Sequence, residues 1–152
     1  MRLTYGIITA GGKDDQIARI VDTLASEGIP EYEIVVVGDC DLHRERLKIV
    51  PFDETQKRGW ITKKKNIVTQ VAKFPVIVYS HDYLLPCKGW YRGLKTFGDD
   101  WDLQMNKIFN ADGTRYRDWC LSPSFPLPKH RERERLLPYQ ADFTEYMYIS
   151  GS

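Results

Sequence analysis

The sequence predicts an α/β fold whose first half forms a mostly parallel sheet, and three observations carry this prediction. Short apolar runs recur through the first half of the chain, and segments with helical periodicity lie between them. Several of these runs are apolar on both faces, which is typical of strands that helices cover from both sides of a sheet. Their spacing fits strand–helix–strand units, whose strands lie parallel.

The first predicted strand spans residues 3–9 and leads into a helix. Pro30 ends that helix, and Gly28 stands where the last turn commonly needs a left-handed residue. The apolar residues of the helix recur at positions i, i+3, i+4, i+7 and i+8, which places them on one stripe: Ile17, Ile20, Val21, Leu24 and Ala25.

Three further strands and a helix complete the first half. Residues 33–38 predict a second buried strand, and residues 48–52 a short third strand, which its proline places at an edge. A second helix is predicted over residues 63–73, with Thr62 as its N-cap. Residues 76–79 predict another buried strand.

The second half of the chain has a different pattern. Residues 90–97 predict a short helix. Residues 101–109 and 114–120 predict an antiparallel hairpin, because the Asp-Gly pair between them is a common hairpin turn. We therefore expect a single domain over residues 1–152, parallel first and antiparallel afterwards.

Composition excludes several classes of protein. The 152 residues include 22 Lys and Arg and 21 Asp and Glu, a net charge of +1, which argues against nucleic acid as a partner. The three widely spaced cysteines argue against a disulfide framework and a zinc module. No apolar run reaches the roughly 18 residues of a membrane span, and the N-terminus has no signal-peptide pattern. We expect a cytoplasmic protein without a membrane span.

Ligands of open parallel sheets bind outside the carboxyl ends of the strands. After the first strand, Thr9, Ala10 and Gly11 are suited to bring backbone N–H groups close to an anion; the alternative is a tight turn into the helix. After the second strand, Asp39 is suited to accept hydrogen bonds from a base or a ribose; the alternative is that it caps a turn.

The strand over residues 76–79 is followed closely by His81 and Asp82. A carboxylate beside an imidazole can hold a divalent cation that bridges phosphate oxygens; the alternative is that His81 packs and Asp82 caps the next segment. Lys63, Lys64 and Lys65 occupy the first turn of the preceding helix, where the helix dipole disfavours cations. A bound diphosphate would make these placements favourable, and a solvated lysine face is the alternative.

These segments, over residues 3–85, resemble the nucleotide-binding half of a GT-A glycosyltransferase of the family-2 type. The resemblance implies a Rossmann-like αβα sandwich. It also implies that Thr9, Ala10 and Asp39 hold the nucleoside, and that Lys65-Asn66 matches the family's basic residue-Asn pair. Combined with the strand-end and helix arguments, it gives these expected donor-binding residues: Thr9, Ala10, Gly11, Asp39, Lys63, Lys65, Asn66 and His81.

The family binds a metal ion and the donor diphosphate through an Asp-x-Asp motif. The matching segment here is Ser80-His81-Asp82, so Asp82 is the implied ligand of Mn²⁺ or Mg²⁺. Residues 146–151 are similar to the family's strand before the helix that carries the catalytic base. The chain ends at Ser152, before such a helix, which leaves three alternatives: the base is absent, is supplied by another segment or chain, or was lost by truncation. The candidate substitutes are these: Asp118, Asp142 and Glu145.

We therefore expect an inverting glycosyltransferase that moves a sugar from a nucleotide-diphospho-sugar to a glycan or other hydroxyl acceptor. Residues 1–85 would bind the nucleotide, and residues 86–152 would form the acceptor side. One alternative is a nucleotide-sugar-binding module or subunit without catalytic activity. A nucleotidyltransferase is a weaker alternative, because the chain lacks the long glycine- and arginine-rich loop expected for that class. The sequence leaves open whether the chain forms a homo-oligomer.

Overall fold

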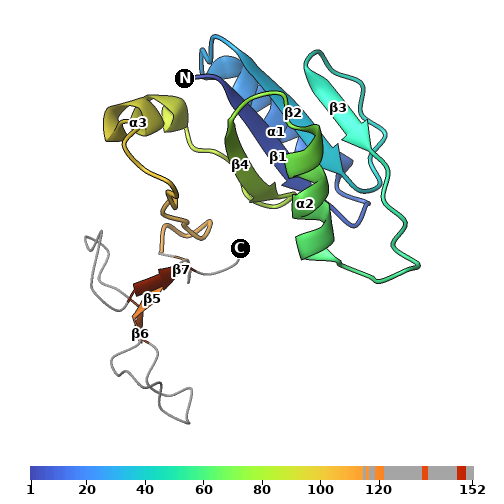
Figure 1. Cartoon of the computed structure of the whole chain (residues 1–152). Helices are drawn as coiled ribbons and strands as arrows, with labels where there is room; N and C mark the ends of the chain where they lie inside the picture. Colours follow the sequence, from blue (N-terminus) through green and yellow to red (C-terminus); the bar gives the residue numbers. More distant parts are fainter. Residues whose placement is uncertain (115, 117–118, 122–134, 137–146, 150–152) are drawn as a thin grey trace. The chain divides into compact units, whose positions relative to one another are not determined.

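A computed structural model of the chain describes residues 1–114, 116, 119–121, 135–136 and 147–149 (Figure 1). The chain divides into two compact units, Met1–Asp99 and Asp100–Ser152. The first unit is an α/β unit with a parallel sheet and three helices, and it contains the candidate site. Within the described part of the chain, no helix has the length and apolar character needed to cross a membrane.

The sheet of the first unit has four strands, all parallel, in the order β3-β2-β1-β4. Their bounds are Leu3–Ile8 (β1), Tyr32–Val37 (β2), Leu47–Val50 (β3) and Val76–His81 (β4). The prediction of a parallel sheet with the third strand at its edge is confirmed. Strand β4 runs two residues further than expected, because its pairing with β1 continues until His81 lies opposite Ile8.

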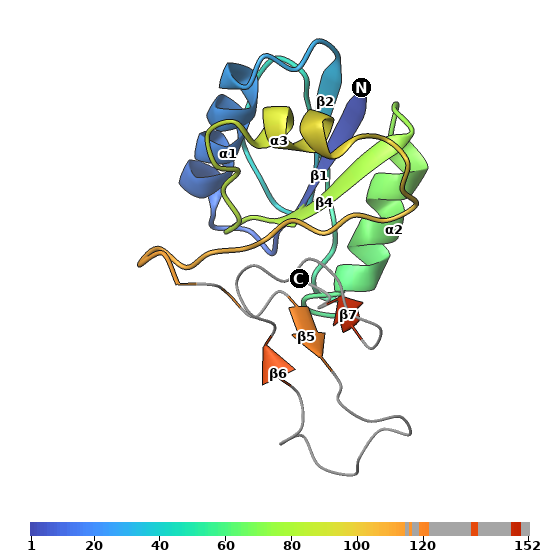
Figure 2. The ribbon, with the colours of Figure 1, turned by 90° about the vertical axis from the view of Figure 1, so that its left-hand side faces the viewer.

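Two helices cover opposite faces of this sheet, as Figures 1 and 2 show from two directions. They are α1 (Asp14–Ser26) and α2 (Ile61–Val71). Four of the five residues predicted as the apolar stripe of α1 are buried, whereas Ala25 is exposed next to the end of the helix. Helix α2 begins earlier than expected, since the Lys64 N–H already donates to the Trp60 carbonyl at 3.1 Å. Thr62 therefore lies inside the helix and is not its N-cap.

Close packing between α2 and the sheet depends on one glycine. A Cβ on Gly6 of β1 would lie 2.4 Å from Cγ1 of Val68, so the helix sits where no side chain on the strand would fit. Val68 joins Ile8, Val35 and Val37 in one buried apolar cluster. The face of the sheet away from α2 is also apolar, because the alternate residues of β1 and β2 are buried there.

The third helix, α3 (Trp90–Phe97), forms over the predicted residues and belongs to the first unit. Its Trp90 ring packs edge-to-face against Tyr5 of β1, with ring centroids 5.7 Å apart. The carboxylate of Glu27, directly after α1, accepts hydrogen bonds from the N–H groups of Gly89 (2.7 Å) and Tyr91 (2.9 Å). A carboxylate thus satisfies N–H groups at the positive end of the α3 dipole.

The predicted hairpin over residues 101–120 is wrong. The described residues of 101–108 form no strand, and β5 (Trp119–Leu121) pairs antiparallel with β6 (Arg135–Leu136) and β7 (Met147–Ile149). The expected turn does form, since the Asn110 N–H donates to the Thr114 carbonyl and the Gly113 N–H to the Asn110 carbonyl. Leu103 is 72% exposed, so burial does not support a longer hairpin, which on its own would be marginal in water.

Candidate functional site

The candidate site lies where the order of strands in the sheet reverses. From β1 the chain moves to β2 and β3 on one side, and then returns to place β4 on the other side of β1. In open α/β sheets, the crevice for a ligand forms at such a switch point, outside the carboxyl ends of the strands. Thr9 and Asp82 are the first residues after β1 and β4, so they stand side by side at this point.

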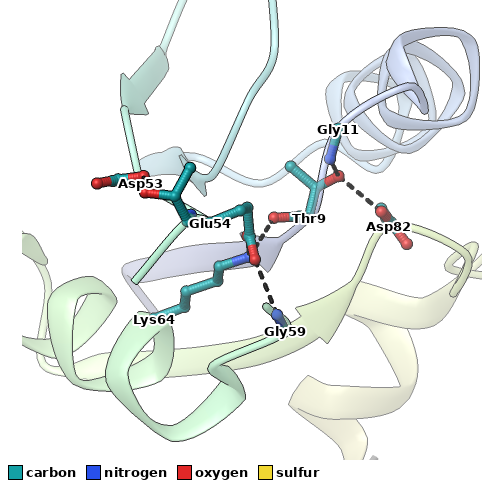
Figure 3. Close-up of polar contacts among 8 residues, drawn as sticks. Thr9, Gly11, Asp53, Glu54, Gly59, Lys64 and Asp82 are labelled. Carbon is teal, nitrogen blue, oxygen red and sulfur yellow. Dashed lines mark hydrogen bonds and ion pairs between the residues drawn. The ribbon is translucent and has the colours of Figure 1, made fainter. Parts of the chain in front are cut away.

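A hydrogen bond joins these two strand ends. The Thr9 hydroxyl donates to Oδ2 of Asp82 at 2.7 Å and accepts the N–H of Gly11 at 3.0 Å (Figure 3). Thr9 is 3% exposed and Asp82 9% exposed. The buried carboxylate therefore has a fixed partner, and the turn after β1 is tied to the same hydroxyl.

The backbone of Thr9 is held as firmly as its side chain. Its N–H donates to the Val37 carbonyl at 3.1 Å. Its carbonyl lies so close to Gly38 that a Cβ on that glycine would be 2.1 Å from the oxygen, and Gly38 has a φ of +138°. Asp39 follows directly, and a Cβ on Gly11 would lie 3.1 Å from Asp39 Oδ2. The predicted residues Thr9, Gly11 and Asp39 thus come together, and both glycines are needed for the close approach.

Two hollows border these residues. The larger, about 450 Å³, is open and is lined by the start of α1 and by Asp39, Cys40 and Asp41. The smaller, about 90 Å³, is lined by residues of α1 and of the segment after β4: Gln16, Arg19, Ile20, Asp82, Tyr83 and Leu85.

The N-terminus of α1 is not suited to a phosphate. Asp14 and Asp15 occupy its first turn, and Asp14 Oδ2 accepts the N–H of Asp41 at 3.2 Å. Asp39 and Asp41 also line the larger hollow, so the charged side chains around this hollow are predominantly negative. This hollow is therefore better matched to a neutral group than to an anion.

The three lysines at the start of α2 do not share one environment. Lys63 is exposed, whereas Lys65 is half-buried with its Nζ 6.0 Å from the centroid of the Tyr79 ring. Burial lowers the pKa of the Lys65 ammonium group. Lys64 is 2% exposed and turns inward: its ammonium donates to the Thr9 carbonyl at 2.5 Å and pairs with the Glu54 carboxylate.

His81 is half-buried at the end of β4, and its ring stacks on Tyr83 with centroids 5.1 Å apart. Burial lowers its pKa from 6.5, the charge of Lys65 lowers it further, and the charge of Asp82 opposes this. The charges of Lys65 and Asp82 therefore both act on the His81 imidazole, in opposite directions. Of the other predicted donor-binding residues, Ala10 and Asn66 are exposed.

Sequence reasoning missed Glu54 and the inward position of Lys64. A signal for Lys64 exists, because Lys64, Val68 and Val71 recur at i, i+4 and i+7, which places the lysine on the stripe that faces the sheet. Glu54 lies in the segment between β3 and α2, where no periodicity marks its partner. The candidate bases Asp118, Asp142 and Glu145 lie outside the described residues.

No cluster of three or more His, Cys, Asp or Glu side chains suited to a metal occurs in the part of the chain that the structure describes. A single buried carboxylate such as Asp82 still fits a cation that takes most of its ligands from phosphates and water. Fold and site together define an α/β protein with a candidate ligand site at the switch point of a parallel sheet. Comparison with protein-family models, with curated proteins and with solved structures finds no match to this chain.

Proposed function

We propose that the chain is a glycosyltransferase of the GT-A type, which transfers a sugar from a nucleotide-diphospho-sugar to an acceptor hydroxyl with inversion. The observation that carries the proposal is the hydrogen bond between Thr9 and Asp82 at the switch point of the sheet. It gives a buried, oriented carboxylate at the position where open α/β sheets bind nucleotides. The sequence pattern around it supports a sugar nucleotide as the ligand.

The distribution of charge suggests how the donor would lie. The hollow beside Asp39 is predominantly negative, so it suits the uncharged nucleoside, whose base and hydroxyl groups can donate to Asp39. The diphosphate would then lie toward the end of β4. Lys65 is near enough to His81 there to lower the pKa of that imidazole, and Lys63 stands exposed on the same helix turn.

A divalent cation would be held by Asp82 together with the phosphate oxygens of the donor, and when bound it would neutralise charge on the leaving diphosphate. The chain's own groups have separate tasks in this reaction. Lys63 and Lys65 would also stabilise the diphosphate as its negative charge develops. A general base would take the proton of the acceptor hydroxyl, and the candidates for this base are Asp118, Asp142 and Glu145.

A second function is favoured by one observation. The residue two positions before Asp82 is Ser80, and its hydroxyl lies near its own strand, 3.2 Å from the His81 carbonyl. The segment therefore offers one carboxylate where the resembled family has two. A nucleotide-sugar-binding subunit without transferase activity would keep the Thr9–Asp82 arrangement and need no second carboxylate.

Calorimetric titration with UDP, GDP and CDP, each with and without Mn²⁺, tests the proposal. We expect one diphosphate to bind, and Mn²⁺ to strengthen its binding. Asp82→Ala should remove the effect of Mn²⁺, whereas Asp22→Ala, on the exposed side of α1, should not. Turnover of a radiolabelled sugar nucleotide separates the two functions, and binding of none of the three diphosphates contradicts both.

A further inference from the structure

Lys64 stands out among the charged residues because its ammonium group is buried in a satisfied site. It contacts the Thr9 carbonyl, the Glu54 carboxylate and the face of the Phe52 ring, whose centroid lies 5.0 Å from Nζ. The side chain of Glu54 is 23% exposed, against 3% for Lys64. The hydrogen bond from Lys64 lowers the pKa of the Glu54 carboxyl, so that carboxyl is ionised at neutral pH.

A charged pair at this place is not explained by packing. Lys64 occupies the stripe of α2 that faces the sheet, where an apolar side chain would pack without the cost of burying a charge. Replacement of buried ion pairs by apolar residues is often neutral or stabilising. Packing therefore does not explain why a charged pair is kept here. The contact of Lys64 with the Thr9 carbonyl connects the pair to the candidate site.

The contacts of Lys64 lead to Asp82 in two steps. Lys64 holds the carbonyl of Thr9, and the hydroxyl of the same Thr9 holds Oδ2 of Asp82 (Figure 3). Gly11 is attached to that hydroxyl as well. Removal of the Lys64 ammonium would leave the buried Thr9 carbonyl without its side-chain donor and would weaken the hold on Thr9.

Glu54 links the segment between β3 and α2 to Lys64. Its Oε2 accepts the N–H of Gly59 at 2.8 Å, and its other oxygen pairs with Lys64. Asp53 next to it accepts the N–H and the hydroxyl of Thr55, which closes the turn. The segment between β3 and α2 is thus folded around the carboxylate that holds Lys64.

We propose that Lys64 is a positioning residue: with Glu54 as its counter-ion, it fixes Thr9 so that the Thr9 hydroxyl presents Asp82 in one orientation. This role rests on the proposed function for its consequence in donor binding, but its structural step does not depend on any ligand. It also separates the role of Lys64 from the proposed role of Lys63 and Lys65 as diphosphate contacts, because the Lys64 ammonium is engaged by Thr9 and Glu54.

Amide hydrogen exchange tests the structural step without a ligand. The test variant is Lys64→Met with Glu54→Gln, which removes both charges together and so leaves neither one buried alone. We expect the Gly11 amide to exchange about three- to tenfold faster relative to the core amide of Val36, the change equivalent to one hydrogen bond. Thr9→Val should give the same relative acceleration, since it removes the acceptor of the Gly11 N–H.

A control variant makes this measurement specific. Lys88→Met, at an exposed lysine, should change nothing. Equal acceleration at Gly11 and Val36 in the double variant, or none at Gly11 while Thr9→Val shows it, overturns the proposal.

Nucleotide binding tests the consequence. With the diphosphate that the wild-type chain binds best among UDP, GDP and CDP, the double variant should lose most of the strengthening by Mn²⁺ and keep its affinity without metal. Full strengthening by Mn²⁺ in the double variant overturns the positioning role. If the wild-type chain binds none of the three, the proposed function fails, and the exchange of Gly11 still decides whether Lys64 positions Thr9.

Discussion

The hydroxyl of Thr9 and the carboxylate of Asp82 meet at 2.7 Å across 73 positions of sequence, at the ends of two paired parallel strands. The contact depends on register, because Ile8 lies opposite His81 and each following residue then leaves the sheet at the same level. Both side chains are buried. One hydroxyl therefore couples the turn after β1 to the carboxylate that the proposed function needs.

Thr9→Val should weaken both the fold and the site. The substitution keeps the shape but leaves Asp82 Oδ2 and the Gly11 N–H without their partner, at a cost of about 1–3 kcal/mol in free energy of unfolding. In the same variant, the strengthening of diphosphate affinity by Mn²⁺ should decrease. Urea unfolding and calorimetry measure the two effects. Thr9→Ser keeps the hydroxyl and should preserve the binding; equal loss of binding in both variants would contradict the role of the hydroxyl.

The free energy of unfolding should fall as the pH is lowered, because of the titration of His81. Because the folded pKa of His81 lies below its ordinary value of 6.5, the unfolded chain binds more protons as the pH falls below that value. The stabilising contribution is therefore complete above pH 6.5 and is lost as the pH falls through the folded pKa. Urea unfolding at pH 7.5 and pH 5.5 should show a smaller difference for His81→Asn than for wild type. An unchanged difference would contradict the prediction.

The apolar runs and the periodicity of α1 were sufficient to predict the parallel sheet, because burial on both faces leaves a strong signal in the sequence. For the site, the sequence indicated the residues that follow each strand, but not which of them come together. Which ends meet depends on strand order, and the Lys64–Glu54 pair depends on a segment without periodicity. The hairpin over residues 101–120 failed because a turn signal does not show whether the flanking residues become buried.

Gly6→Ala should destabilise the chain by about 1–3 kcal/mol through overpacking, since the new Cβ would lie 2.4 Å from Cγ1 of Val68. The backbone of Gly6 needs no left-handed conformation, so the effect is steric. In a Val68→Ala background the same substitution should cost much less, because the two clashing methyl groups are gone. A double-mutant cycle by urea unfolding measures this coupling. Additive effects would show that α2 can move away from β1.

Glu27→Ala should lower the free energy of unfolding by about 1–2 kcal/mol, as for the loss of a helix cap. The Glu27 carboxylate accepts the N–H groups of Gly89 and Tyr91 at the start of α3, and alanine can replace neither bond. The control is Glu31→Ala, whose carboxylate is 60% exposed and 4.0 Å from Arg2. That control should stay within about 0.5 kcal/mol of wild type. An equally small effect of Glu27→Ala would contradict the capping role.

Substitution of Lys63 and Lys65 by Gln should separate ligand binding from stability. Both lysines lie near the N-terminus of α2, Lys63 in its first turn and Lys65 at the start of the second, where the helix dipole disfavours cations, so their removal should leave stability unchanged or raise it slightly. Diphosphate affinity should fall, and its dependence on salt should become weaker, because fewer charges attract the anion. Calorimetry at low and high NaCl, beside urea unfolding, measures both quantities.

The matched control for this pair is Lys57→Gln with Lys73→Gln, which removes the same charge from exposed positions outside α2. These lysines pack over the rings of Trp60 and Phe74 and have no proposed contact with the donor, so the control should change the long-range attraction only. Equal loss of affinity in the two double variants would mean that net charge governs binding. Unchanged affinity in Lys63→Gln with Lys65→Gln would mean that these lysines are a solvated face of α2.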